Sequence, residues 1–119
     1  PAASQTEAAD PCEEGRRLYL ENNYLAATPL LEQCLEQGES LVALLPLCMM
    51  SVIQGRANDA AGYGERALAL DPENANIRYW YGRALLRADR VEDARKEWET
   101  GLQLNFDHAG ILEGLARLA

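Results

Sequence analysis

Residues 81–98 read YGRALLRADRVEDARKEW, and in this stretch Gly82 is followed twelve residues later by Ala94. A further small residue, Gly101, comes seven residues after that. Two earlier segments repeat the same spacing of small residues: Gly15, Ala27, Cys34 and Cys48, Ala60, Ala67. Successive copies begin 33 and 34 residues apart, so the chain holds three copies of one structural unit.

Each copy is predicted to be a pair of helices. Small residues recurring on paired helices mark the places where two backbones approach closely. Ala and Leu are abundant and aromatic residues make up only 7%, which favours helix over strand. The turn-forming residues Asn22-Asn23, Gly55 and Asp89-Arg90 separate the two helices of each copy. We therefore predict an all-α fold of about seven helices, at residues 11–21, 25–37, 41–54, 57–70, 75–88, 91–104 and 108–118.

The repeat resembles the tetratricopeptide repeat family, whose period is about 34 residues. The third copy carries the resemblance through Tyr81-Gly82, Leu85, Ala94 and Trp98. The second carries it through Leu47, Ala60, Ala67 and Asp71-Pro72, and the first through Gly15, Leu18, Tyr24, Ala27 and Leu31. The resemblance implies a right-handed α-solenoid of antiparallel helix pairs.

This family fold organises the chain as a single domain over residues 10–119. Its units are expected at about 8–40, 41–74 and 75–108, with a closing helix at 109–119 that is either a true cap or the truncated start of a fourth unit. Residues 1–9 are expected to be a flexible leader. The termini look processed or truncated, and the compartment stays open between bacterial cytoplasm and periplasm.

Charge and composition argue against several functions. The net charge of −8 disfavours nucleic acid, whose binding depends on Lys and Arg, and it disfavours an anionic membrane surface. The longest apolar run, residues 41–53, is too short to span a bilayer. With a single His and no Cys-x-x-Cys pair, a metal site is improbable. We expect no enzyme activity, no cofactor and no membrane insertion.

The resemblance also implies a concave groove, lined by the first helix of each unit, that holds another protein. By register, the predicted lining residues are Cys12, Arg16, Tyr19, Leu45, Met49, Val52, Ile53, Tyr79, Arg83, Leu86 and Arg87. Independently, residues 41–53 are apolar nearly all round, and the part left facing the groove is a candidate binding surface. Leu44, Leu47 and Met50 are assigned to the core instead.

Arg16 and Arg83 would flank the apolar centre of the groove. An arginine pairs with a carboxylate through two hydrogen bonds, so a matching partner is an apolar peptide or helix with acidic groups. The alternative is that both arginines pair with neighbouring Glu side chains. The Lys/Asn/Arg clamp with which some family members hold a chaperone C-terminus is not expected, because the corresponding positions lack its two Asn.

These features predict a protein–protein interaction adaptor or scaffold. The alternatives are a self-assembling structural module and a chaperone of a secretion-system subunit; in solution we expect a monomer or a weak homo-oligomer.

The three cysteines leave at least one thiol unpaired within a monomer. Cys12 lies near the start of one helix and Cys34 near the end of its antiparallel partner, so the two lie at the same end of the first pair. We hypothesise a Cys12–Cys34 disulfide in an oxidising compartment. The alternative is that Cys34 and Cys48 are simply small packing residues.

Overall fold

Seven α-helices occupy residues 10–119, the part of the chain that the computed structural model describes. Their bounds are α2 Pro11–Leu20, α3 Tyr24–Glu36, α4 Leu41–Ile53, α5 Ala57–Leu70, α6 Ala75–Arg87, α7 Val91–Leu104 and α8 Ala109–Leu118. Every predicted helix is confirmed, with ends that differ by at most one residue. The expected flexible leader, residues 1–9, lies outside the described residues.

The turn inside each helix pair has the same backbone geometry. Asn22, Gly55 and Asp89 each adopt a positive φ, of 64°, 79° and 64°. Glycine enters this left-handed region without steric cost, and Asn and Asp tolerate it better than other side chains do. These three residues are 33 and 34 positions apart, so the repeat extends to the turns.

Polar side chains cap the helices at the places where units begin. The Ser40 hydroxyl accepts a hydrogen bond from the Val42 N–H, and the Asn74 side chain accepts from the N–H groups of Asn76 and Ile77. The last helix is capped by His108. Its Nδ1 accepts from the Ile111 N–H at 3.2 Å.

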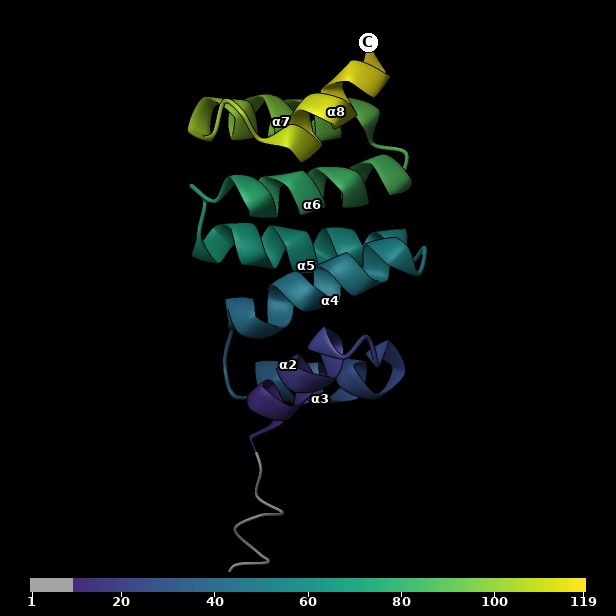
Figure 1. The fold of residues 1–119 in the computed structure, drawn as a ribbon, viewed down its shortest axis with the longest axis vertical. Helices are drawn as coiled ribbons and strands as arrows, with labels where there is room; N and C mark the ends of the chain where they lie inside the picture. Colours follow the sequence, from purple (N-terminus) through teal and green to yellow (C-terminus); the bar gives the residue numbers. More distant parts are fainter. Residues whose placement is uncertain (1–9) are drawn as a thin grey trace, which may run out of the picture.

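The helices pack as antiparallel pairs, α2 with α3, α4 with α5 and α6 with α7, and α8 covers the last pair (Figure 1). The pairs are stacked in chain order along one axis, and the molecule measures 59 × 25 × 22 Å. All nine small residues of the repeat are buried, which confirms the register read from the sequence: Gly15, Ala27, Cys34, Cys48, Ala60, Ala67, Gly82, Ala94 and Gly101.

A large side chain lies opposite the small residue in the best-packed unit. A Cβ atom added to Gly82 would come within 2.1 Å of Trp98 Nε1, so only glycine lets the indole lie against α6. Trp98 is 2% exposed, and its Nε1 donates a hydrogen bond to the Tyr79 carbonyl oxygen at 3.1 Å. The indole therefore fixes the spacing of α6 and α7.

The central helix α4 has more buried residues than any other helix of the described chain. Leu44, Leu47 and Met50 are completely buried, as predicted. Leu47 and Met50 pack with residues of α3 in a cluster that joins the first and second units, and Leu44 packs with residues of α5 and α6 in a cluster that joins the second and third. None of the helices in residues 10–119 is long and apolar enough to cross a membrane.

Candidate protein-binding groove

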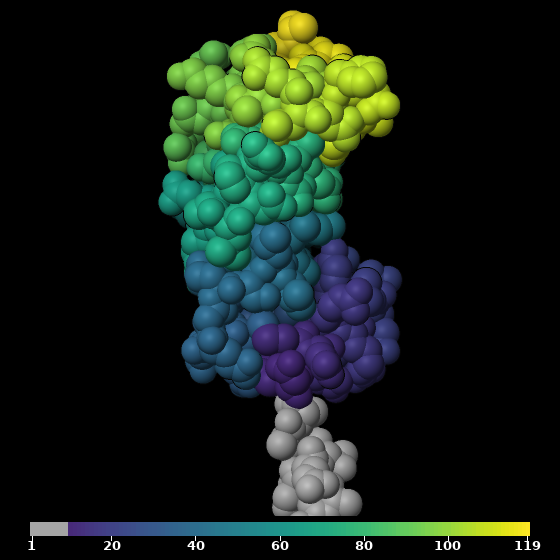
Figure 2. Space-filling view, turned by 90° about the vertical axis from the view of Figure 1, so that its left-hand side faces the viewer, coloured from purple at the N-terminus to yellow at the C-terminus, as the bar shows by residue number. Residues whose placement is uncertain are grey.

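The first helices of successive units lie side by side on one face of the stack. α2 contacts α4, and α4 contacts α6, while α8 follows on the same side at the C-terminal end (Figure 1). Figure 2 shows this face in profile on its right-hand side, where the outline recedes between the first and the last helices. We call the surface of α2, α4, α6 and α8 the groove.

A pocket of about 510 Å³ lies at the N-terminal end of the groove, between α2 and α4. It brings together two of the predicted residues, Cys12 and Arg16. The other lining residues are Asp10, Glu13, Arg17, Leu20 and Val42. We call it the α2–α4 pocket.

A second pocket, of about 380 Å³, lies at the opposite end of the groove, where α6 and α8 meet over Trp98 of α7. It brings together four of the predicted residues, Tyr79, Arg83, Leu86 and Arg87. Sequence reasoning missed the rest of its lining: Trp98, Gly110, Glu113, Gly114 and Arg117. We call it the α6–α8 pocket.

The middle of the groove is apolar but partly closed. Leu45 and Met49 are half-buried, and Ile53 is 53% exposed. The Tyr19 hydroxyl lies 3.3 Å from Met49 Sδ and donates a hydrogen bond to it, so this tyrosine bridges α2 and α4. Burial raises the pKa of Tyr19, and the neighbouring Tyr24 adds to the effect.

The predicted assignment of Val52 to the groove lining is wrong. Val52 has no exposed surface, because it packs with Ala60 and Ala84 in the core between the second and third units. Trp80 of α6, which is partly buried, packs against this cluster. The register alone could not show that an aromatic side chain from the next unit would close over Val52.

Three arginines on the groove helices form no ion pair with a carboxylate within residues 10–119. Of the eleven Lys and Arg side chains, seven form ion pairs within residues 10–119. The four that form none there are Arg16, Arg83, Arg87 and Lys96, and the three arginines belong to the groove helices α2 and α6. Pairing with neighbouring Glu therefore does not account for Arg16 or Arg83 among the described residues.

Arg83 is held in place by aromatic rings instead. Its Cζ lies 4.7 Å from the centroid of the Trp80 ring and 5.8 Å from that of Tyr79. A guanidinium stacked on a ring keeps the N–H groups at its edge available for a hydrogen-bond acceptor.

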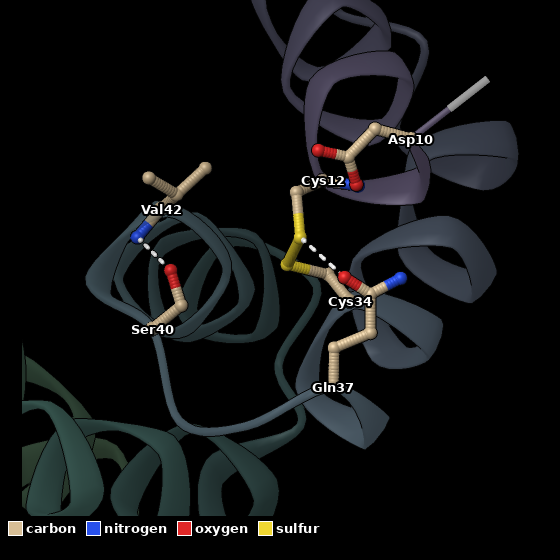
Figure 3. The surroundings of a disulfide bond; sticks show 6 residues. All are labelled: Asp10, Cys12, Cys34, Gln37, Ser40 and Val42. Atoms are coloured by element: carbon tan, nitrogen blue, oxygen red, sulfur yellow. Dashed lines mark hydrogen bonds between the residues drawn. A yellow bond between two sulfur atoms is a disulfide. The ribbon is translucent and has the colours of Figure 1, made fainter.

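Cys12 and Cys34 are joined by a disulfide in the structure, with the Cα atoms 4.8 Å apart (Figure 3). It ties the start of α2 to the end of α3, beside the α2–α4 pocket. The Cys12 N–H donates to the Asp10 carboxylate at 3.0 Å, which anchors the first turn of α2 (Figure 3). Cys48 is free and buried, and it takes no part in the groove.

Antiparallel helix pairs stacked in register define the class of helical repeat proteins known as solenoids. Within this class, residues 51–118 match the family model described as tetratricopeptide repeat, which covers more than half of the chain. The chain belongs to the tetratricopeptide repeat family. No curated protein matches it by sequence.

Solved structures of other repeat proteins share this fold. A mutant of MamA matches with a TM-score of 0.76 at 20% identity, over 85% of this chain and 59% of that chain. A mutant of the Thermobaculum terrenum O-GlcNAc transferase matches with a TM-score of 0.73 at 25% identity, over 84% of this chain and 20% of that one. A second MamA structure gives 0.72 at 19% identity, over 87% and 63%. The chain thus spans about three-fifths of MamA and a fifth of the transferase.

Proposed function

We propose that the chain is a non-catalytic adaptor that holds a segment of another protein in the groove. The partner segment is apolar at its centre, where it meets Leu45, Met49 and Ile53, and carries acidic groups toward its ends. Tetratricopeptide repeats are generally protein–protein interaction modules, and the chain belongs to that family. The observation that carries the finer proposal is the set of arginines on the groove helices that form no ion pair within residues 10–119.

Charge supports this choice of partner. The chain has a net charge of −8, so an acidic partner is repelled by most of its surface. Arg16, Arg83 and Arg87 form no ion pair within residues 10–119, and they lie on either side of the apolar middle of the groove. A partner with acidic groups would be attracted at this face and disfavoured elsewhere.

Affinity capture with charge-reversed baits tests the proposal. Arg83→Glu places a negative charge in the groove, whereas Lys96→Glu makes the same change of charge on α7, outside it. The matched pair separates a groove effect from a change in overall charge. A third bait, Met49→Glu, places a charge in the apolar centre.

We expect one set of proteins to be captured from the source organism by the wild type and by Lys96→Glu, and lost with Arg83→Glu and Met49→Glu. Circular dichroism confirms that each bait is folded. If all four baits capture the same proteins in the same amounts, the partner binds elsewhere and the proposal is wrong.

Self-assembly is a second candidate, favoured by apolar side chains at both ends of the stack. Leu25 is 90% exposed near the start of α3, and Phe106 is 83% exposed in the turn before α8. If these ends pair between copies, light scattering after size exclusion will show a mass that grows with concentration. A concentration-independent monomer excludes this function.

A further inference from the structure

We infer that the α6–α8 pocket is a binding site for a carboxylate that stands next to an aromatic or apolar group of the partner. The inference deepens the proposed function and rests on it for its biological meaning. It assigns one acidic anchor of the partner to the α6–α8 end of the groove.

The aromatic floor of the pocket is rigid. The Tyr79 and Trp98 rings are stacked, with centroids 6.4 Å apart, and the hydrogen bond from Trp98 Nε1 to the Tyr79 carbonyl fixes them to one another. His108 packs against the other side of Tyr79, at 5.3 Å between centroids. A floor of this kind offers an apolar surface without the entropic cost of ordering flexible side chains.

Two glycines of α8 bring its backbone directly onto these rings. A Cβ atom at Gly110 would lie 2.7 Å from Tyr79 Cε1, and one at Gly114 would lie 2.5 Å from Trp98 Cζ3. They are four residues apart, so both belong to the same face of the helix. α8 can therefore lie close against the rings while the 380 Å³ space beside them stays open.

The polar wall of the pocket is cationic. Arg83, Arg87 and Arg117 line it, and Glu113 is its single carboxylate. Glu113 lies 3.7 Å from Arg117 in a pair whose side chains are 77% and 69% exposed, so it reaches only one of the three arginines. Arg83 and Arg87 keep their donors free within the described chain, and a planar carboxylate can accept two parallel hydrogen bonds from a guanidinium.

The α2–α4 pocket does not have this character. Its lining holds two arginines, Arg16 and Arg17, and two carboxylates, those of Asp10 and Glu13, so its formal charges sum to zero. Arg17 is further occupied by hydrogen bonds to Glu14 and Glu21. The excess of positive charge that would select a carboxylate is therefore found at the α6–α8 end.

Tryptophan fluorescence can report binding at this site, because the chain has two tryptophans and both lie in or next to the pocket. Trp98 lines the pocket, and Trp80 supports the Arg83 guanidinium. The probe is N-acetylphenylalanine, which carries a carboxylate beside an aromatic ring. Its neutral match is N-acetylphenylalanine amide.

We expect a saturable fluorescence change with the carboxylate probe, and binding at least about tenfold weaker for the amide, because a charge-assisted pair is lost. Arg83→Gln should weaken binding of the carboxylate by about the same factor. Lys96→Gln, on α7 outside the groove, should leave it unchanged. Shifts of the Gly110 and Gly114 amide signals in NMR spectra provide a second readout that does not depend on tryptophan.

Equal responses to the two probes, no saturable binding by the wild type, or unchanged binding by Arg83→Gln would each overturn the inference. The outcome is separable from that of the proposed function. If Met49→Glu abolishes capture of the partner but the pocket binds no carboxylate probe, the proposed function is supported and the carboxylate site is wrong. If the probe binds but capture is insensitive to Met49→Glu, the carboxylate site is supported and the proposed groove function is wrong.

Discussion

The first and third units of this protein follow the same register but are held together by different means. In the third unit, the Trp98 indole lies against Gly82, and a half-buried ion pair joins Arg78 to Glu97. In the first unit, the residue opposite Gly15 is the smaller Leu31, and the additional link is the Cys12–Cys34 disulfide. The pattern of small residues thus specifies where helices approach, and each unit supplements that packing in its own way.

Position in the stack accounts for part of this difference. α6 and α7 have neighbours on both sides, in α5 and α8, whereas α2 and α3 have described neighbours on the α4 side alone. Among the described residues the first unit therefore has one interface with a neighbouring unit. The covalent link between α2 and α3 adds a constraint that this packing does not supply. The groove therefore runs from a first unit that is cross-linked by a disulfide to a third unit that is held by side-chain packing.

The largest effect is expected from Trp98→Ala in the packed unit. The change removes a fully buried indole and its hydrogen bond, and should lower the free energy of unfolding by about 3–5 kcal/mol. Urea denaturation followed by circular dichroism measures it. Leu31→Ala makes the matching change in the first unit and should cost less. An equal or larger loss for Leu31→Ala would contradict the comparison.

The next effect is expected from opening the disulfide. It closes a loop between residues 22 positions apart, so its loss should destabilise the first unit by about 3 kcal/mol. In hydrogen exchange, α2 and α3 should exchange faster after reduction, while α6 and α7 should not change. Cys12→Ser should behave like the reduced wild type and should not respond to reductant.

A thiol count on the unfolded protein decides whether the bond forms. With an intact disulfide, one thiol, that of Cys48, is free without reductant, and three are free with it. Three free thiols in both conditions would show that the first unit is held by packing alone.

The repeat could be predicted from the sequence because it depends on residue size at fixed spacing, as at Gly82 and Ala94. The groove lining could be predicted only in part. Arg83 and Arg87 could be placed by register, but Val52 could not be recognised as core, since Trp80 of the following unit covers it. Arg117 was missed although it lies 34 residues after Arg83, a spacing that carries the register into α8. The glycine face of α8 became meaningful only when the structure placed Tyr79 and Trp98 against it.

A smaller effect is expected from Arg78→Met, which breaks the ion pair of the third unit. Arg78 Nη1 lies 2.6 Å from Glu97 Oε1, and the same guanidinium donates two hydrogen bonds to the Pro72 carbonyl. Both side chains are largely buried, at 16% and 22% exposed, so we expect a loss of about 1–2 kcal/mol. Arg90→Met removes a pair that is about half exposed and should cost less than about 1 kcal/mol. Equal losses for the two variants would show that the Arg78 pair adds nothing to packing.

The smallest effect concerns Cys48 of α4, in the second unit, which lies between the first and the third. Burial raises the pKa of its thiol from 9.0 to about 12. The unfolded chain therefore releases this proton at lower pH than the folded chain does. Its contribution to stability is complete below about pH 9 and is lost as the pH rises toward 12.

Between pH 8 and pH 9.5 the wild type should lose roughly 1 kcal/mol more than Cys48→Ala, which has no thiol to ionise. Urea denaturation of both proteins at the two pH values gives the difference, in which the titration of other groups cancels. The folded wild type should also resist thiol reagents at pH 8. If Cys48 reacts readily there, or if the two proteins lose stability equally, α4 is open to solvent. The middle of the groove would then be less well packed than the third unit.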